Sequence, residues 1–309
     1  MIRDTKRMRP RAVRRRAAAL GAAASLLAAS AHAYTAAGDR LFPATILLPQ
    51  IAPSDDAYFT TSTLLDHSKA LPSSDDRLTD FSAVYNKTLT ENLSIGIEGG
   101  WSRLDPAGAG TRSGWQNIDT TVKYLMVEND AHEFLMSAGI DREWGDTGAK
   151  GIGASRRGAT TPAFFFGKGM GDLGVDFLRP VAIVGTLGYQ IADASPRPDL
   201  VTTGLALEYS MPYLESKVRA LALPAVVRAM TPMVELVFST PAGNTHGATT
   251  TAFVAPGVNY AGRGWEFGLE ALFPATRASG TGIGVTAQLH FALDYLFANS
   301  IGRPLFGAP

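Results

Sequence analysis

The stretch Trp265-Glu266-Phe267-Gly268-Leu269-Glu270-Ala271-Leu272-Phe273 carries the pattern that decides the fold. Its large apolar side chains alternate with Glu, Gly and Glu until the end of the stretch. An alternation with a period of two predicts a β-strand with one face in an apolar medium and the other in a polar one. Runs of this kind recur from Asp55 to Leu293.

The recurring runs predict twelve strands, an even number, as single-chain bacterial outer-membrane barrels have. Ten or fourteen strands are the neighbouring alternatives. The predicted strands cover residues 55–64, 77–88, 93–103, 115–127, 132–144, 161–170, 176–190, 199–211, 231–240, 249–260, 265–274 and 281–293.

The connections between these strands alternate in length. Short turns are predicted at residues 89–92, 128–131, 171–175 and 261–264, and longer loops lie between them in the chain order. Outer-membrane barrels have short periplasmic turns and longer outer loops. A soluble periplasmic β-protein, which the chain length would also allow, has no reason to sort its loops in this way. We therefore predict an all-β fold: a transmembrane antiparallel up-and-down β-barrel over residues 55–293.

One connection breaks the alternation. Residues 212–230 should form a short periplasmic turn, but their apolar residues around Pro224 predict one or two short amphipathic helices. Such a helical connection would cap the periplasmic mouth or lie at the membrane interface. A docking surface for a partner is the alternative.

The N-terminal 33 residues have the pattern of an export signal. A basic region rich in arginine precedes the apolar stretch from Ala17 to Ser30, and Ala31-His32-Ala33 matches a cleavage site. The arginine run leaves a twin-arginine export route as an alternative. We predict a signal peptide at 1–33, an irregular lead-in at 34–54 and a C-terminal tail at 294–309, which would either tuck into the periplasmic mouth or hang free.

Removing the signal changes the charge of the chain. The signal holds eight of the 28 basic residues and one of the 28 acidic residues, which leaves 20 basic against 27 acidic residues. A mildly acidic mature chain argues against nucleic-acid binding. The absence of cysteine excludes disulfides, thiolate metal sites and a lipoprotein anchor. We predict no cofactor and no metal site; His67 and His246, both in outer loops, are a weak alternative for a metal.

The polar face of the predicted strands would line the lumen. Eleven residues on that face are candidates for contact with a solute: Asp80, Glu98, Asp119, Lys123, Asp141, Glu208, Glu235, Glu266, Glu270, Gln288 and His290. Carboxylates in a narrow interior must be paired, hydrogen-bonded or hydrated. They would form a packing network inside the barrel, an acidic lining that favours cations or hydrogen-bonding solutes, or both.

The opposite face would meet lipid. Six aromatic residues lie near predicted strand ends, where the aromatic girdles of membrane barrels are found: Tyr85, Trp101, Tyr124, Trp144, Tyr209 and Trp265. A lipid-hydrolysing barrel would need a histidine and a serine facing lipid near the outer leaflet. None of the histidines is predicted there, so the sequence argues against an enzyme.

The C-terminal third resembles a known group of proteins. Its motifs are Thr231-Pro232-Met233-Val234-Glu235-Leu236, Gly268-Leu269-Glu270-Ala271-Leu272-Phe273-Pro274 and Asn299-Ser300-Ile301-Gly302-Arg303-Pro304-Leu305-Phe306. They are similar to outer-membrane barrels allied to the "MetA-pathway of phenol degradation" family of proposed transporters. The resemblance implies a barrel in the bacterial outer membrane and passage of hydrophobic or aromatic compounds. It brings no catalytic residues.

Three hypotheses follow for the function. The first is passive passage or binding of small solutes through the barrel. The second is a structural or docking protein of the outer membrane that transports nothing, and the third is an outer-membrane acyl hydrolase. The expected partners are outer-membrane lipid, a small-molecule solute and, during biogenesis, the barrel-assembly machinery.

Overall fold

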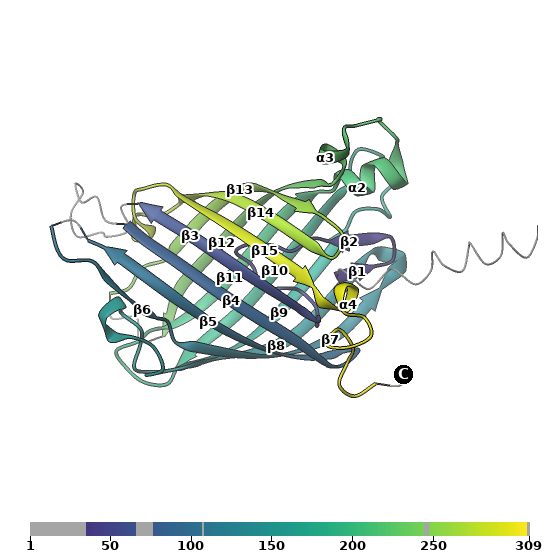
Figure 1. Ribbon diagram of the computed structural model, residues 1–309. Coiled ribbons are helices and arrows are strands. Elements are labelled where there is room, and N and C mark those ends of the chain that lie inside the picture. The colour runs from purple at the N-terminus through teal and green to yellow at the C-terminus, as the bar shows by residue number, and fades with distance from the viewer. Residues whose placement is uncertain (1–34, 66–76, 107, 244–246, 308–309) are drawn as a thin grey trace, which may run out of the picture.

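Twelve antiparallel strands close into a barrel in the computed structural model, which describes residues 35–65, 77–106, 108–243 and 247–307 (Figure 1). The signal peptide predicted at 1–33 lies outside the described residues. The strands are β3 (Asp56–Leu65), β4 (Arg77–Thr90), β5 (Leu93–Asp105), β7 (Ile118–Asn129), β8 (Phe134–Trp144), β9 (Ala159–Gly169), β10 (Val181–Ala192), β11 (Asp199–Tyr209), β12 (Met230–Gly243), β13 (Thr251–Ala261), β14 (Trp265–Pro274) and β15 (Gly284–Ala292).

Each strand pairs with the next, and β15 pairs with β3 from Ala292↔Asp56 to Gly284↔Leu64, which closes the barrel. A short strand, β6 (Arg112–Trp115), pairs with β5 just before β7 begins. The predicted fold class is therefore confirmed. Among the described residues, no helix is both long enough and apolar enough to cross a membrane.

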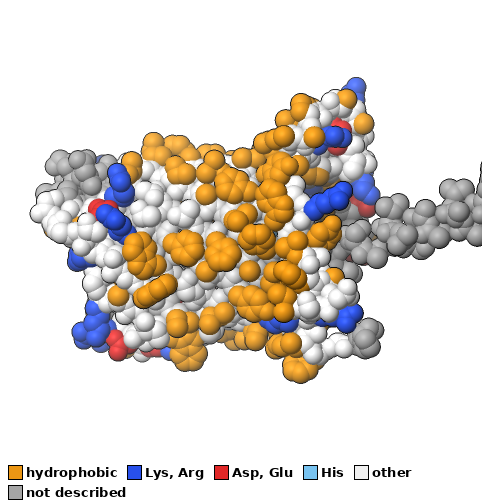
Figure 2. All heavy atoms as spheres, in the orientation of Figure 1, with side chains coloured by type: hydrophobic (Ala, Val, Ile, Leu, Met, Phe, Trp, Pro, Cys, Tyr) orange, Lys and Arg blue, Asp and Glu red, His pale blue; other side chains and the backbone are white. Residues whose placement is uncertain are grey.

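The outer surface of the barrel is apolar. Figure 2 shows hydrophobic side chains spread over the strands, with charged side chains gathered toward the two ends. Large exposed side chains alternate with inward-facing neighbours, as in Phe267 and Leu269 of β14, which lie between the buried Glu266 and Glu270. An apolar belt of this extent is too large for a water-exposed surface and matches a lipid environment.

The turns at one end of the barrel are short, and both chain ends described by the structure lie there (Figure 1). We call this the periplasmic end, following the arrangement of outer-membrane barrels. A short 3-10 helix, η1 (Asp130–His132), occupies a turn at this end. Two others, η2 (Lys150–Ile152) and η4 (Arg277–Ser279), occupy loops at the opposite end.

The lead-in enters the barrel. Residues 35–42, predicted as irregular, form a small hairpin of β1 (Thr35–Ala37) and β2 (Arg40–Phe42). Residues 43–53, which we call the luminal segment, then run inside the barrel without regular structure. Leu48 and Ile51 of this segment are buried together with Phe42 against side chains of β8 to β11, such as Phe165 and Val184. The hydrophobic core of the protein therefore lies in the lumen, between the luminal segment and one wall.

Inward-facing glycines make room for the luminal segment. A β-carbon at Gly268 would lie 2.5 Å from the Cδ1 atom of Ile46, and one at Gly204 would lie 2.8 Å from the Cγ atom of Leu48. Glycine is the residue that permits such a close approach between two parts of the chain. These glycines therefore form shallow sockets for apolar side chains of the luminal segment.

One strand boundary was predicted wrongly. The strand predicted at 176–190 begins only at Val181, so the turn predicted at 171–175 extends over residues 170–180. Local bonds close this turn, such as Leu178 N–H to the carbonyl oxygen of Val175 at 2.9 Å. The carbonyl oxygens of Arg179 and Pro180 accept hydrogen bonds from the Arg40 side chain. Arg40 thus holds the end of this turn against the lead-in hairpin, which the alternation of Val175 and Phe177 alone could not show.

The long connection after β11 forms a projection, which we define as residues 210–229. It contains α2 (Met211–Tyr213), the π-helical turn η3 (Leu214–Val218) and α3 (Ala225–Arg228), so the short helical connection predicted for 212–230 is present. It extends sideways from the barrel wall at the periplasmic end (Figure 1).

The C-terminal tail follows a single turn of helix, α4 (Leu293–Leu296), and packs against the end of β4. Leu305 N–H donates to the Thr88 carbonyl oxygen at 3.1 Å. The Lys87 ammonium group donates to the Ile301 carbonyl oxygen at 2.9 Å and also to the carboxylate of Asp55. Of the two arrangements expected for the tail, the structure thus has it held at the periplasmic end.

Candidate functional site: a lumen with two cavities above a luminal segment

A cavity of about 420 Å³ occupies the middle of the lumen, and we call it the central cavity. Ile46, Leu47 and Leu48 of the luminal segment border it on one side. Its wall is rich in hydroxyl groups from seven strands: Thr60, Ser82, Thr121, Thr161, Thr186, Thr202 and Ser239. A cavity of this volume is within the range of pockets that hold small organic ligands. Its mixed lining can accommodate a solute with both apolar and hydrogen-bonding parts.

Three of the candidate residues carry charge into the central cavity: Glu98, Asp141 and Lys123. Asp141 accepts a hydrogen bond from the Thr121 hydroxyl at 2.9 Å. The Lys123 ammonium group donates to the carbonyl oxygen of Gln50 and lies 4.3 Å from the centre of the Phe165 ring. Because the Lys123 ammonium group is bonded to the luminal segment, the carboxylates of Glu98 and Asp141 are the charged groups that remain for contact with a solute in the cavity.

A second cavity of about 490 Å³, the outer cavity, lies nearer the long loops. Asp119 and Glu143 line it, and Asp119 is the register partner of Glu98, so the two cavities are neighbours along β5 and β7. Glu143 is paired with Arg197, whereas Asp119 faces the acidic residues of both cavities. Acidic groups therefore follow one side of the lumen from the outer loops to the luminal segment.

The luminal segment is held by the carboxylate of Glu235, on β12. Its two oxygens accept the backbone N–H groups of Ile46 at 2.6 Å and of Leu47 and Leu48 at 3.0 Å each. An irregular segment buried in a barrel has backbone donors that no strand satisfies, and a carboxylate is a strong acceptor for them. Glu235 therefore fixes the luminal segment across the lumen.

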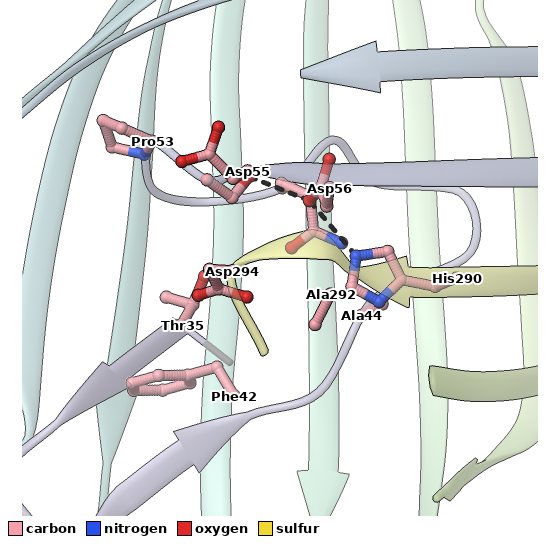
Figure 3. Close-up of a pocket in the computed structure, with 11 residues that line it drawn as sticks. Thr35, Phe42, Ala44, Pro53, Asp55, Asp56, His290, Ala292 and Asp294 are labelled. Carbon is pink, nitrogen blue, oxygen red and sulfur yellow. Dashed lines mark hydrogen bonds and ion pairs between the residues drawn. The ribbon is translucent and has the colours of Figure 1, made fainter. Parts of the chain in front are cut away.

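Glu266 holds the segment at a second point. Its carboxylate accepts the Ala44 N–H at 2.7 Å and the Asn259 side-chain amide at 3.0 Å, and the same amide donates to the Ala44 carbonyl oxygen at 2.7 Å. The His290 ring lies 3.9 Å from the Glu266 carboxylate and 3.1 Å from that of Asp56. Figure 3 shows His290 and Asp56 turned toward each other beside Ala44. This chain of contacts joins the luminal segment to the first and last strands.

A small cavity of about 60 Å³, the basal cavity, lies beside these residues, and Asp294 of α4 lines it (Figure 3). Burial, with a smaller contribution from the nearby Asp55 and Asp56, raises the pKa of the Asp294 carboxyl to about 7. In the unfolded chain the same carboxyl has a pKa near 4. The folded protein therefore loses stability as the pH rises from about 4 through 7, because only the folded state resists ionisation of this group.

Replacing Asp294 with asparagine should remove this pH dependence. We expect Asp294→Asn to raise the unfolding temperature at pH 8 and to leave it nearly unchanged below about pH 3, where the native carboxyl is mostly protonated in both states. Calorimetry of the detergent-solubilised protein at several pH values measures the difference. An equal effect at both pH values would show that the substitution acts through packing and not through charge.

In the structure, the eleven candidate residues fall into groups by their position in the lumen, and the sequence alone could not distinguish these groups. Glu98, Lys123, Asp141 and Asp119 line the two larger cavities. Asp80 accepts hydrogen bonds from Ser102 and Gln116 near the outer cavity. Six others are buried on inward-facing positions lower in the barrel, where the luminal segment lies: Glu208, Glu235, Glu266, Glu270, Gln288 and His290.

The main component that sequence reasoning missed is the luminal segment itself. Ile46, Leu47, Leu48 and Ile51 are apolar residues in a lead-in that was predicted only to be irregular, with no place in the lumen. A second signal was the excess of inward carboxylates over bases on the strands, because unpaired carboxylates need donors from elsewhere. Those donors are backbone N–H groups of the luminal segment.

The histidines give no support to the other chemistries considered. His132 lies in a periplasmic turn and contacts Asp172, and His290 faces the lumen. His67 and His246 lie outside the described residues. Within the described part of the chain, no three or more His, Cys, Asp or Glu side chains are placed to hold a metal ion.

Comparison with solved structures places the fold among outer-membrane barrels. The structure is similar to the COG4313 outer membrane channel from Pseudomonas putida F1, with a TM-score of 0.52 and 13% identity over 82% of this chain and 99% of that one. It also matches the KdgM porin, with a TM-score of 0.45 and 9% identity over 76% of this chain and 98% of that one. No family model and no curated protein matches the sequence. The likeness therefore concerns the fold.

Proposed function

We propose that this protein is a channel of the bacterial outer membrane that admits small solutes into its lumen and passes them to the periplasm without an energy source. The observation that carries the proposal is the central cavity, a space of about 420 Å³ enclosed by the barrel wall and bordered by the luminal segment. A structural barrel of this width could fill its lumen with side chains. Here short hydroxyl side chains and the glycines Gly96 and Gly204 make up much of the wall, which leaves the space free.

The lining supports a solute with a small apolar or aromatic body and a few hydrogen-bonding groups. The apolar side comes from Leu48, Phe165 and Val237, and the hydroxyl-rich wall supplies donors and acceptors. This agrees with the hydrophobic or aromatic compounds implied by the resemblance to the phenol-degradation family. The likeness to the COG4313 channel is consistent with the same fold serving as a channel. The export signal and the apolar belt of the barrel support the outer-membrane location.

Two measurements test the proposal. Planar-bilayer recordings of the refolded full-length barrel should show discrete conductance steps. Liposome swelling should be faster with a small polar aromatic solute that protein-free liposomes exclude than with a disaccharide, because the cavity lining combines apolar and hydroxyl groups. A barrel that gives neither conductance nor swelling would favour the structural or docking alternative.

Acidic residues that border the two cavities should set the ion preference of the channel. We expect Glu98→Gln with Asp141→Asn to lower the cation-over-anion permeability ratio by roughly 25-fold, because each charge about 4 Å from a passing ion contributes roughly 1 kcal/mol in water, or roughly five-fold. Reversal potentials in a salt gradient measure this ratio. The matched control is Glu208→Gln, which removes a carboxylate buried below the cavities and should leave the ratio unchanged. If Glu208 had the larger effect, the ion path would not follow the cavities.

A further inference from the structure

The projection formed by residues 210–229 has a rigid root. The Ser210 hydroxyl accepts the N–H of Tyr213, and the Tyr213 hydroxyl donates to Glu133 at 2.8 Å. The Arg40 guanidinium lies 4.0 Å from the centre of the Tyr213 ring. Lys217 is paired with Asp39 of the lead-in hairpin at 2.6 Å. These contacts fix the direction in which the rest of the projection leaves the barrel.

Beyond the root, the projection exposes apolar side chains in a defined arrangement. Leu221 is 45% exposed and Val226 is 55% exposed. The Glu215 carboxylate accepts the N–H groups of Leu221 at 2.9 Å and of Leu223 at 3.4 Å, on either side of Ala222, whose φ of 52° is rare for a residue with a side chain. The loop is therefore bent and held so that apolar side chains point away from the protein.

Basic residues flank the apolar stretch. Arg219 precedes it and Arg228 ends α3, and both are exposed. In Figure 1, α3 lies on the side of the projection toward the strands, and α2 lies on the far side. Figure 2 shows hydrophobic side chains on the flank toward the strands and basic side chains at the tip. An apolar face turned toward the membrane with cations at its border is the pattern of interfacial membrane-binding segments.

The projection also begins at the edge of the lipid-facing belt. It leads directly into β12, whose Met230 pairs with Tyr260 of β13. The ring of Tyr260 lies 5.6 Å from that of Trp265, which begins β14. Aromatic residues at this position mark the level where acyl chains meet headgroups. The apolar flank of the projection is thus continuous with the surface that contacts lipid.

We infer that residues 219–228 rest on the phospholipid leaflet at the periplasmic end of the barrel. Leu221 and Val226 enter the boundary between headgroups and acyl chains, and Arg219 and Arg228 bind lipid phosphates. This inference rests on the proposed outer-membrane location. The projection would anchor the tilt and depth of the barrel at one point of its circumference, since it leaves the wall between β11 and β12 only.

Spin labels on single cysteines test this inference, because the natural chain contains no cysteine. The full-length protein would carry the label at Leu221→Cys or Val226→Cys in vesicles of phosphatidylethanolamine and phosphatidylglycerol. Collisions with oxygen report a lipid environment, and collisions with a water-soluble nickel chelate report water. Ser216→Cys, an exposed site of the same projection, is the aqueous control, and Leu269→Cys on β14 is the lipid control.

We expect labels at 221 and 226 to favour oxygen as the label at 269 does, and the label at 216 to favour nickel. Nickel access at 221 and 226 would overturn the inference, and so would protection from both reagents, which would indicate coverage by protein. If the label at 269 also favours nickel, the outer-membrane location itself fails, so the two failures are distinguishable.

Substitution of the two arginines, Arg219 and Arg228, provides a second test of the inference. Each basic residue near an anionic membrane surface contributes roughly five-fold to the binding equilibrium. Arg219→Gln with Arg228→Gln should therefore lower the oxygen-to-nickel collision ratio at 226 in vesicles that contain phosphatidylglycerol. Arg112→Gln, on the short strand β6 at the opposite end of the barrel, is the control and should leave the ratio unchanged. If the ratio is unaltered in the double variant, Arg219 and Arg228 do not bind lipid phosphates.

Discussion

Replacing Glu235 and Glu266 with glutamine should make wide openings of the barrel far more frequent. The two carboxylates accept four backbone N–H groups of the luminal segment, three of them at Glu235. A glutamine keeps one acceptor oxygen but turns an NH₂ group toward the remaining donors. Hydrogen bonds to charged groups contribute roughly 1.5–3 kcal/mol each. A loss of roughly 3 kcal/mol would raise the population with a displaced luminal segment by about 100-fold.

Single-channel recordings measure this change as the fraction of time spent in a large-conductance state. A chain that lacks residues 35–52 gives the conductance of the barrel without the segment, and the openings of the double variant should reach that level. Asp80→Asn, which also removes a lumen carboxylate but contacts Ser102 and Gln116, is the matched control. Equal opening frequencies in the wild type and the double variant would mean that the segment is not held by these bonds.

A steric variant tests the same idea without touching charge. Gly268→Val places side-chain atoms where the Cδ1 atom of Ile46 now lies, only 2.5 Å from the position of a β-carbon. It should displace the segment locally and raise the opening frequency. Gly99→Val on β5 is the control, because a β-carbon there meets no atom within 4 Å.

The strands could be predicted from the sequence because each strand of a membrane barrel shows the alternation of apolar and polar residues locally. Each residue of a run such as Trp265 to Phe273 meets either lipid or lumen, so the period of two is present in every strand. The error at β10 shows the limit of this argument. Val175 and Phe177 continue the alternation, but they lie in a turn whose end is bound by a distant side chain, Arg40. Local patterns cannot report a partner 140 residues away in the chain.

The candidate site was predictable only in part for the same reason. Inward carboxylates were recognised from the alternation, but their separation into cavity-lining and segment-binding groups depends on where residues 43–53 lie. That position is set by contacts between residues far apart in sequence, such as Ile46 with Glu235 and Ala44 with Asn259. The apolar residues of the lead-in and the shortage of bases were the available signals.

Arg40→Ala should cause the largest loss of stability among single substitutions at the periplasmic end. The Arg40 side chain is 0% exposed, pairs with Glu133 at 3.3 Å and donates to the carbonyl oxygens of Arg179, Pro180 and Val181. Alanine would remove the cationic partner of the buried Glu133 carboxylate and the side-chain donor to all three carbonyl oxygens, of which Pro180 and Val181 keep a backbone donor. Breaking a buried pair in this way costs roughly 3–5 kcal/mol.

The loss should appear first in the lead-in hairpin, since Arg40 joins β2 to the turn after β9 and to the root of the projection. We expect limited proteolysis with proteinase K to cleave Arg40→Ala between residues 35 and 53 under conditions that leave the wild type intact there, and heat to unfold the variant barrel at a lower temperature. Arg40→Lys should behave almost as Arg40→Ala does, because an ammonium group cannot span four acceptors in the plane that the guanidinium fills. Arg103→Ala removes an exposed arginine paired with Asp105 on the same strand and should change neither measurement. If Arg40→Ala resisted protease as the wild type does, the hairpin would be held by its apolar contacts around Phe42 and Ala37, and the polar cluster would have no part in placing the luminal segment.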